Sequence, residues 1–133
     1  MQRKQRAIVV DDMIFCRDIL TEFLEDRDYL VRSFADVTAC PLFSAPMSKC
    51  PLHEACTDIL LLDNQMPHMH GVDFLELQQR GNCHIPINNI AILSASWSRE
   101  DLDRAFQLGC EIFHKPYSFT VLASWLTERE KQF

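Results

Sequence analysis

The chain has 133 residues, which is enough for one ordinary domain with its own hydrophobic core and too few for a second. Its formal net charge is −6 and it has no basic face, which disfavours direct binding to nucleic acid. No apolar run approaches the roughly 20 residues of a membrane-spanning helix, and no signal-peptide pattern is present. We therefore expect one cytoplasmic domain over residues 1–133, with its core from about residue 7 to 130 and no membrane partner.

The first part of the chain alternates between strand and helix patterns. Residues 7–11 are apolar, β-branched and end in acid, which is typical of a buried parallel strand that delivers carboxylates to its C-terminal edge. Residues 13 to about 25 predict an amphipathic helix, and residues 29–34 predict a second strand. The apolar residues at helical spacing are Ile14, Phe15, Ile19, Leu20, Phe23 and Leu24.

Residues 36–57 form an irregular segment rich in cysteine and proline. Its three prolines, at positions 41, 46 and 51, exclude one long helix. Its potential metal ligands are Cys40, Cys50, His53 and Cys56. Three thiols and an imidazole can hold zinc, and three thiols can hold an iron–sulfur cluster. The spacing lacks a close CxxC pair, so a loop with partly buried cysteines is the favoured alternative.

The remaining elements continue the alternation. Strands are predicted at residues 58–62, 89–93 and 111–114, and helices at residues 71–79, 101–108 and 118 to about 130. Ser98 is placed as the N-cap of the second of these helices, Asp101 completes a capping-box-like arrangement, and Gly109 is its C-terminal stop. Five strands that alternate with helical connections predict an α/β fold, with a parallel sheet covered by helices on both faces.

Polar side chains follow four of the predicted strands, and the C-terminal ends of parallel strands share one edge where function gathers. These side chains are Asp11, Asp12, Asp63, Ser94 and Lys115. Three carboxylates brought together repel one another and need a cation, and oxygen ligands suit Mg²⁺. An ammonium and a hydroxyl suit the oxygens of a phosphoryl group, and a carboxylate can be its acceptor. The pattern favours an aspartyl-phosphate site.

Four motifs in this order resemble the receiver domains of bacterial response regulators in two-component systems: VVDD, LLLDNQMPHMHG, AILSA and HKP. The resemblance runs from about Ala7 to Glu130 and implies a doubly wound, flavodoxin-like sheet of five strands in the order 2-1-3-4-5. It also implies that Asp63 accepts the phosphoryl group. Asp12, Asp63 and the backbone carbonyl of Gln65 would bind Mg²⁺ directly, with Asp11 acting through water.

The same resemblance gives roles to residues near the acceptor. Lys115 would pair with the phosphoryl oxygens, Ser94 would hydrogen-bond to them, and the Lys115–Pro116 bond is expected to be cis. Gly71 follows the acceptor, where glycine permits a backbone that other residues resist. Two histidines of the acceptor loop, His68 and His70, are interpreted as solvated residues rather than metal ligands.

The chain departs from the family at the switch residue. Receivers place Tyr or Phe three residues before the lysine, and this sequence has Ile112 there, with Phe113 beside it. Neighbouring side chains of a strand point to opposite faces. Either the aromatic switch that works with Ser94 is missing, or a shortened turn after Gly109 shifts the register.

The function implied is phosphorylation-controlled protein interaction. A sensor histidine kinase or phosphotransfer protein would supply the phosphoryl group, and the fourth helix, fifth strand and fifth helix would present a changed surface to a downstream protein. The chain would be a monomer or a phosphorylation-promoted dimer, and it would catalyse only its own phosphorylation and dephosphorylation. Two alternatives are a degenerate receiver that binds partners without phosphorylation and a small phosphatase with an aspartate nucleophile, although no residues remain for a substrate lid.

Overall fold

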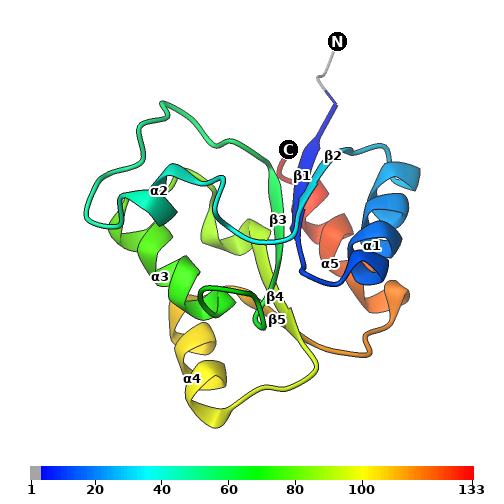
Figure 1. Cartoon of the computed structure of the whole chain (residues 1–133). Helices are drawn as coiled ribbons and strands as arrows, with labels where there is room; N and C mark the ends of the chain where they lie inside the picture. The colour runs from blue at the N-terminus through cyan, green and yellow to red at the C-terminus, as the bar shows by residue number, and fades with distance from the viewer. Residues whose placement is uncertain (1–3) are drawn as a thin grey trace.

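A computed structural model describes residues 4–133 of the chain (Figure 1). The elements in this range are β1 (Arg6–Val10), α1 (Ile14–Asp26), β2 (Leu30–Phe34), α2 (Pro41–Ser44), β3 (Ile59–Asp63), α3 (Gly71–Arg80), the 3-10 turn η1 (Ile87–Asn89), β4 (Ile90–Ser94), α4 (Arg99–Leu108), β5 (Glu111–His114) and α5 (Phe119–Glu130). The strands pair in parallel in the order β2-β1-β3-β4-β5, which confirms the predicted α/β fold and strand order.

The register of the sheet brings the C-terminal ends of the central strands level with one another. Asp63 lies opposite Leu93, and Ser94 lies opposite His114. Asp11 follows directly after β1, whose last residue pairs with Leu62. The polar residues that the sequence places after separate strands therefore reach a single edge of the sheet.

Helices cover both faces of the sheet, with α1 and α5 on one side and α2, α3 and α4 on the other (Figure 1). One core cluster includes Leu20, Leu24 and Leu122, and the other includes Val72 and Leu75. Because both faces are covered, every residue of β3 and β4 is buried, and these strands have no polar alternation. Each fully buried large apolar side chain contributes about 1.5–3 kcal/mol relative to exposure.

Helix α1 is confirmed, but the face that it buries is narrower than its apolar residues predict. Leu20 and Leu24 are buried. Ile14, Phe15 and Ile19 are 56, 77 and 52% exposed. The helix has apolar residues on more than one face, so helical spacing alone did not identify which face packs on the sheet.

The segment between β2 and β3 is irregular, as predicted, apart from the four-residue helix α2. This helix begins at Pro41, where proline is tolerated because the first turn has no hydrogen-bond acceptor for its missing N–H. Val37 and Leu42 are buried, and Val37 belongs to the core cluster on the α3 side. The segment is therefore packed against the domain although it lacks regular structure over most of its length.

The predicted ends of α4 and the predicted cis bond are also confirmed. The Ser98 side chain accepts a hydrogen bond from the backbone N–H of Asp101, and Gly109 ends the helix with φ of 89°, in the left-handed region that favours glycine. The Lys115–Pro116 peptide is cis. Among the described residues, none of the helices combines the length and apolar character that a bilayer span requires.

Candidate functional site

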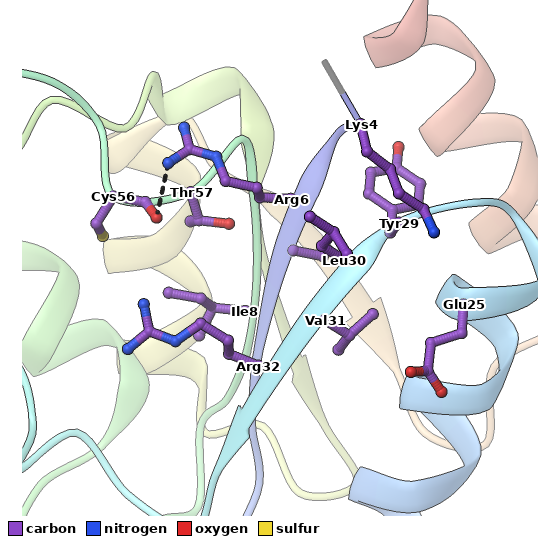
Figure 2. A pocket seen from close by; sticks show the side chains of 11 residues that line it. Lys4, Arg6, Ile8, Glu25, Tyr29, Leu30, Val31, Arg32, Cys56 and Thr57 are labelled. Atoms are coloured by element: carbon purple, nitrogen blue, oxygen red, sulfur yellow. Dashed lines mark hydrogen bonds between the residues drawn. The ribbon is translucent and has the colours of Figure 1, made fainter.

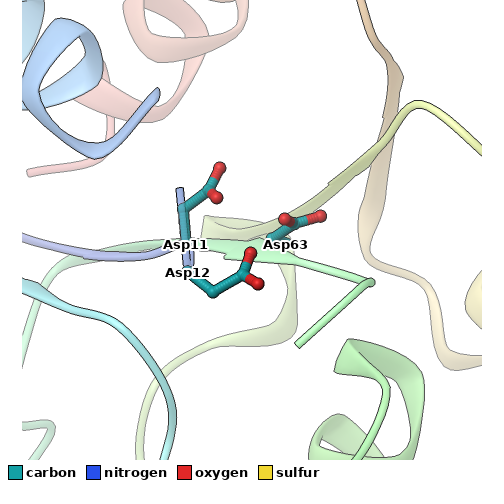
Figure 3. A group of neighbouring side chains, drawn as sticks. All are labelled: Asp11, Asp12 and Asp63. Atoms are coloured by element: carbon teal, nitrogen blue, oxygen red, sulfur yellow. The ribbon is translucent and has the colours of Figure 1, made fainter. Parts of the chain in front are cut away.

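Three carboxylates meet at the C-terminal edge of the sheet (Figure 3). Asp11 and Asp12 follow β1, and Asp63 is the last residue of β3. One oxygen from each lies within 4.8 Å of the others. Asp11 and Asp63 are 2 and 5% exposed, whereas Asp12 faces solvent. The donor set consists of carboxylate oxygens alone, which fits a hard divalent cation such as Mg²⁺.

Lys115, which directly follows β5, supplies positive charge at the same edge of the sheet. Its Nζ lies 2.9 Å from Asp11 Oδ2 and 3.5 Å from Asp63 Oδ2. Burial of the ammonium is outweighed by its hydrogen bond to Asp11 and by the charges of both carboxylates, so the pKa of Lys115 is raised. One ammonium cannot balance three carboxylates, so the edge retains net negative charge that a divalent cation would neutralise.

The acidity of Asp63 reflects this crowding. The pKa of Asp63 is raised to about 6, chiefly by burial, which the charge of Lys115 opposes and the charge of Asp11 reinforces. Its Oδ1 accepts a hydrogen bond from the backbone N–H of Gln65, at 3.2 Å. A cation bound between the carboxylates would favour the charged form that a nucleophilic acceptor requires.

We expect the raised pKa of Asp63 to make the metal-free protein less stable as pH rises. Between the ordinary pKa of 3.8 and the folded pKa of about 6, the folded state binds more protons than the unfolded state. The stabilising contribution is therefore complete below pH 3.8 and is lost as pH rises to about 6. Urea unfolding in EDTA across this window should show Asp63→Asn gaining stability relative to the parent chain. A constant difference would contradict the prediction.

Ser94 bonds to the side chain of Gln65. The Ser94 hydroxyl donates a short hydrogen bond to Gln65 Oε1, while Gln65 Nε2 donates to the carbonyl of Ser96 at 2.8 Å. The backbone N–H of Ser96 donates to Ser94 Oγ at 3.1 Å. The side chain of Gln65 thus bridges the loops after β3 and β4.

The two candidate switch residues point to different sides of the sheet. Ile112 packs against the cluster on the α3 and α4 side, whereas Phe113 is buried in the cluster on the α1 and α5 side. Phe113 stacks edge-on against Trp125, with ring centroids 6.0 Å apart. The pairing of β5 with β4 is continuous from Glu111 to His114, with Ile112 opposite Ile92.

A buried network that the sequence analysis did not predict links the acceptor loop to α4. Asn64, next to the acceptor, donates from Nδ2 to Asp101 Oδ2 at 2.8 Å and accepts from the backbone N–H of Val72 at 3.1 Å. Asp101 Oδ1 also accepts a hydrogen bond from Arg104 Nη1 at 3.2 Å. Asp101 was identified only as part of a helix cap, because sequence gives no sign of a contact across 37 positions.

The two loop histidines differ in their surroundings. His68 lies near the surface with its Nε2 3.8 Å from Asp36 Oδ2. His70 places Nδ1 2.8 Å from Asp101 Oδ2, which joins it to the buried network. The interpretation as solvated residues describes His68 but is incomplete for His70.

The cysteines of the irregular segment are brought near one another. A single cavity of about 280 Å³ is lined by Cys40, Cys50 and Cys56, together with Cys83, which follows α3. His53 is exposed and does not line this cavity. Cys83 was missed because it lies outside the segment in sequence.

Comparisons with known proteins agree with this geometry. The family model for the response regulator receiver domain matches residues 7–127. A protein-glutamate methylesterase/protein-glutamine glutaminase 1 of Burkholderia pseudomallei is 31% identical over 114 residues, which are 85% of this chain and 29% of that protein. A protein-glutamate methylesterase/protein-glutamine glutaminase of Treponema pallidum is 29% identical over 112 residues, 84% of this chain and 26% of that protein. The chain thus spans less than a third of the length of these relatives.

Solved structures show the same fold. The receiver domain of the Francisella response regulator 1452 superposes with a TM-score of 0.74 at 20% identity, over 97% of this chain and 99% of that one. The Vibrio cholerae chemotaxis protein CheY4 gives a TM-score of 0.67 at 24% identity, over 95 and 98% of the two chains. The match of the family model over most of the sequence, on a sheet with an acidic cluster at its C-terminal edge, shows that the chain belongs to the family of response regulator receiver domains.

Proposed function

We propose that the chain is a phosphorylation-controlled signalling domain that accepts a phosphoryl group on Asp63. The supporting observation is the position of its carboxylate, which lies with Asp11 and Asp12 within 4.8 Å and has Lys115 Nζ 3.5 Å away. A sensor histidine kinase or phosphotransfer protein supplies the group as phosphohistidine. The P–N bond breaks with its electron pair returning to the imidazole, and an oxygen of Asp63 forms the new bond to phosphorus.

The chain's own residues position and neutralise the transferred group. Asp12, Asp63 and the backbone carbonyl of Gln65 would hold Mg²⁺, with Asp11 acting through water, and the cation would neutralise charge on the phosphoryl oxygens. Lys115, already directed at Asp63, donates to one of these oxygens.

The Ser94 hydroxyl transmits the effect of phosphorylation from the site to the loop after β4. In the structure it donates to Gln65 rather than toward the acceptor. A phosphoryl group offers a charged acceptor, which makes a stronger hydrogen bond than a neutral amide oxygen. Ser94 then leaves Gln65, and the loop that leads into α4 moves with it.

This movement changes the surface that a downstream protein recognises. Helix α4, strand β5 and helix α5 form the output face, and a downstream protein binds there. Asp101 connects the start of α4 to Asn64 beside the acceptor, which gives the acceptor loop a second route to this helix. The protein acts in the cytoplasm as a monomer or a phosphorylation-promoted dimer, without catalysing turnover of an external substrate.

The test is intact mass spectrometry after incubation with Mg²⁺ and acetyl phosphate. We expect a Mg²⁺-dependent phosphoryl adduct on the parent chain and none on Asp63→Asn. Asp18→Asn, on helix α1, is the control for loss of an acidic residue elsewhere and should form the adduct as the parent does. A folded parent chain that binds Mg²⁺ without forming an adduct would favour a receiver that acts without phosphorylation, and continuous release of inorganic phosphate at a high rate would favour the phosphatase alternative.

A further inference from the structure

Four of the six cysteines surround one cavity on the opposite side of the domain's core from α1. Cys40 precedes α2, Cys50 and Cys56 belong to the irregular segment, and Cys83 follows α3. The cavity has a volume of about 280 Å³, and its remaining lining is largely apolar. Cys16 and Cys110 do not line it. Cysteines from three separate parts of the chain therefore line the same cavity.

Hydrogen bonds hold the middle of the irregular segment against the end of α3. The backbone N–H of Cys50 donates to the carbonyl of Gly81 at 2.7 Å. Lys49 Nζ donates to the carbonyl of Arg80 at 3.0 Å. Because Cys83 lies two residues beyond Gly81, these contacts bring Cys50 to the same end of the cavity as Cys83.

A second contact continues this attachment on the far side of Cys50. His84 Nε2 lies 2.8 Å from the carbonyl oxygen of Leu52. The residue after Cys83 therefore bonds to the residue two positions after Cys50. The segment around Cys50 and the segment around Cys83 therefore run beside each other, and contacts on both sides of Cys50 hold them together.

Arg6 holds the end of the irregular segment that carries Cys56 (Figure 2). Its guanidinium donates to the carbonyl of Cys56 at 3.3 Å and to that of Ala55 at 3.2 Å. It also pairs with Asp58 at 3.4 Å, at the start of β3. The first strand thereby fixes the backbone at Cys56 beside the cavity.

The electrostatics of the thiols agree with their proximity. Burial raises the pKa of Cys83, and the thiolate charges of Cys56, Cys50 and Cys40 raise it further. Burial likewise raises the pKa of Cys40, with further contributions from Cys56 and Cys50. A metal ion bound among them would stabilise the thiolates and release their protons.

None of the four cysteines at the cavity is fully buried, and Cys56 is exposed. Cys110 differs from them, because it is a buried member of the core cluster and its Sγ donates to the carbonyl of Ala105 at 3.6 Å. The cavity instead has four thiols, which is the complete ligand number of a tetrahedral thiolate site. Long irregular segments inside compact domains are uncommon unless they are functional, and a metal can supply the cohesion that regular structure would give.

We propose that Cys40, Cys50, Cys56 and Cys83 form a second metal centre, in which four thiolates hold one soft metal group, either Zn²⁺ or an iron–sulfur cluster. Within residues 4–133, the three aspartates are the only group of three or more potential ligands whose atoms lie within 4.8 Å of one another, so the four sulfurs must move closer together when the metal binds. Each thiol loses its proton as its bond to the metal forms. The centre anchors this segment to the end of α3 and is separate from the acceptor site.

The test begins with metal analysis and absorption spectra of the full chain purified without oxygen. We expect stoichiometric zinc, or iron with acid-labile sulfide, and the spectrum identifies which of them is held. The apoprotein is then titrated with Co²⁺ as a probe, and it should develop the intense thiolate-to-cobalt absorption of a tetrahedral sulfur site.

Variants define the ligand set. Cys83→Ser should lose at least tenfold in Co²⁺ affinity and weaken the thiolate absorption, while Cys16→Ser and His53→Ala should bind as the parent does. Circular dichroism shows whether each variant is folded. A folded, reduced parent with no stoichiometric metal and no thiolate–cobalt band overturns the proposal. So does a mass lower by two hydrogen atoms, which shows a disulfide in the anaerobic protein, or a metal centre that depends on His53 and not on Cys83.

Discussion

Replacing Lys115 with Met should destabilise the metal-free protein by about 2–4 kcal/mol, because it leaves two buried carboxylates without their counter-charge. Nζ of Lys115 lies 2.9 Å from Asp11 Oδ2 and 3.5 Å from Asp63 Oδ2, and the side chains of these aspartates are 2 and 6% exposed. Addition of Mg²⁺ should restore more stability in the variant than it adds to the parent, because the ammonium no longer competes with the cation for the carboxylates. Urea unfolding in EDTA and in Mg²⁺ measures both effects.

Lys131→Met is the matched control. Lys131 pairs with Glu128 at 3.0 Å, but both side chains are largely exposed, so its loss should change stability by less than about 1 kcal/mol with or without Mg²⁺. The Lys115 variant should also form the acetyl phosphate adduct more slowly. If Mg²⁺ stabilised both variants and the parent equally, Lys115 would not be part of the charge balance at the acidic edge.

The sequence predicted the sheet well because its central strands carry an unusually clear pattern. The strands that end at Asp63 and at Ser94 are continuously apolar, which only a strand buried on both faces can be. Strand order came from the resemblance to receivers and not from periodicity. Helix α1 shows the limit of pattern, since Phe15 has the right spacing and is nevertheless exposed.

The acidic site could be predicted for a related reason. Each of its residues stands at the end of a strand or just after it, so the topology alone brings Asp11, Asp63 and Lys115 to the same edge. The contacts of Gln65 and Asn64 depend instead on the directions of side chains in loops, which no spacing encodes. Hence the bond from Gln65 to Ser94 and the bond from Asn64 to Asp101 emerged only from the structure.

The cysteine cavity was predicted only in part. Three of its thiols lie close enough in sequence to be considered together, but Cys83 lies 27 positions after Cys56 and comes from another element. His53 was grouped with them because it is near in sequence, and it faces solvent. In an irregular segment neither helical nor strand periodicity constrains where a side chain points, so proximity along the chain was a poor guide.

Gly71→Ala should destabilise the protein by about 1–3 kcal/mol, because the added methyl group has no space. A Cβ at this position would lie 2.8 Å from the carbonyl oxygen of Asp63 and 3.2 Å from the Cα of Asn64. Gly71 was expected to provide an unusual backbone conformation, but among the described glycines only Gly109 has a positive φ. Its role is instead to let the start of α3 approach the acceptor strand, where its N–H donates to the Asn64 carbonyl at 3.0 Å.

Gly81→Ala separates this effect from the general consequence of filling a glycine. A Cβ there would lie 2.5 and 2.9 Å from the two methyl carbons of Leu42 and 3.2 Å from the carbonyl oxygen of Leu77, while the φ of −86° at Gly81 suits alanine. Because Leu42 is buried and must repack, we expect this variant also to cost about 1–3 kcal/mol. Gly71→Ala should also slow adduct formation, since relief of the clash must move the peptide of Asp63, whereas Gly81→Ala should leave the rate unchanged. Equal rates for the two variants would mean that the loop after β3 yields to the added methyl group, and that the acceptor is not held by this contact.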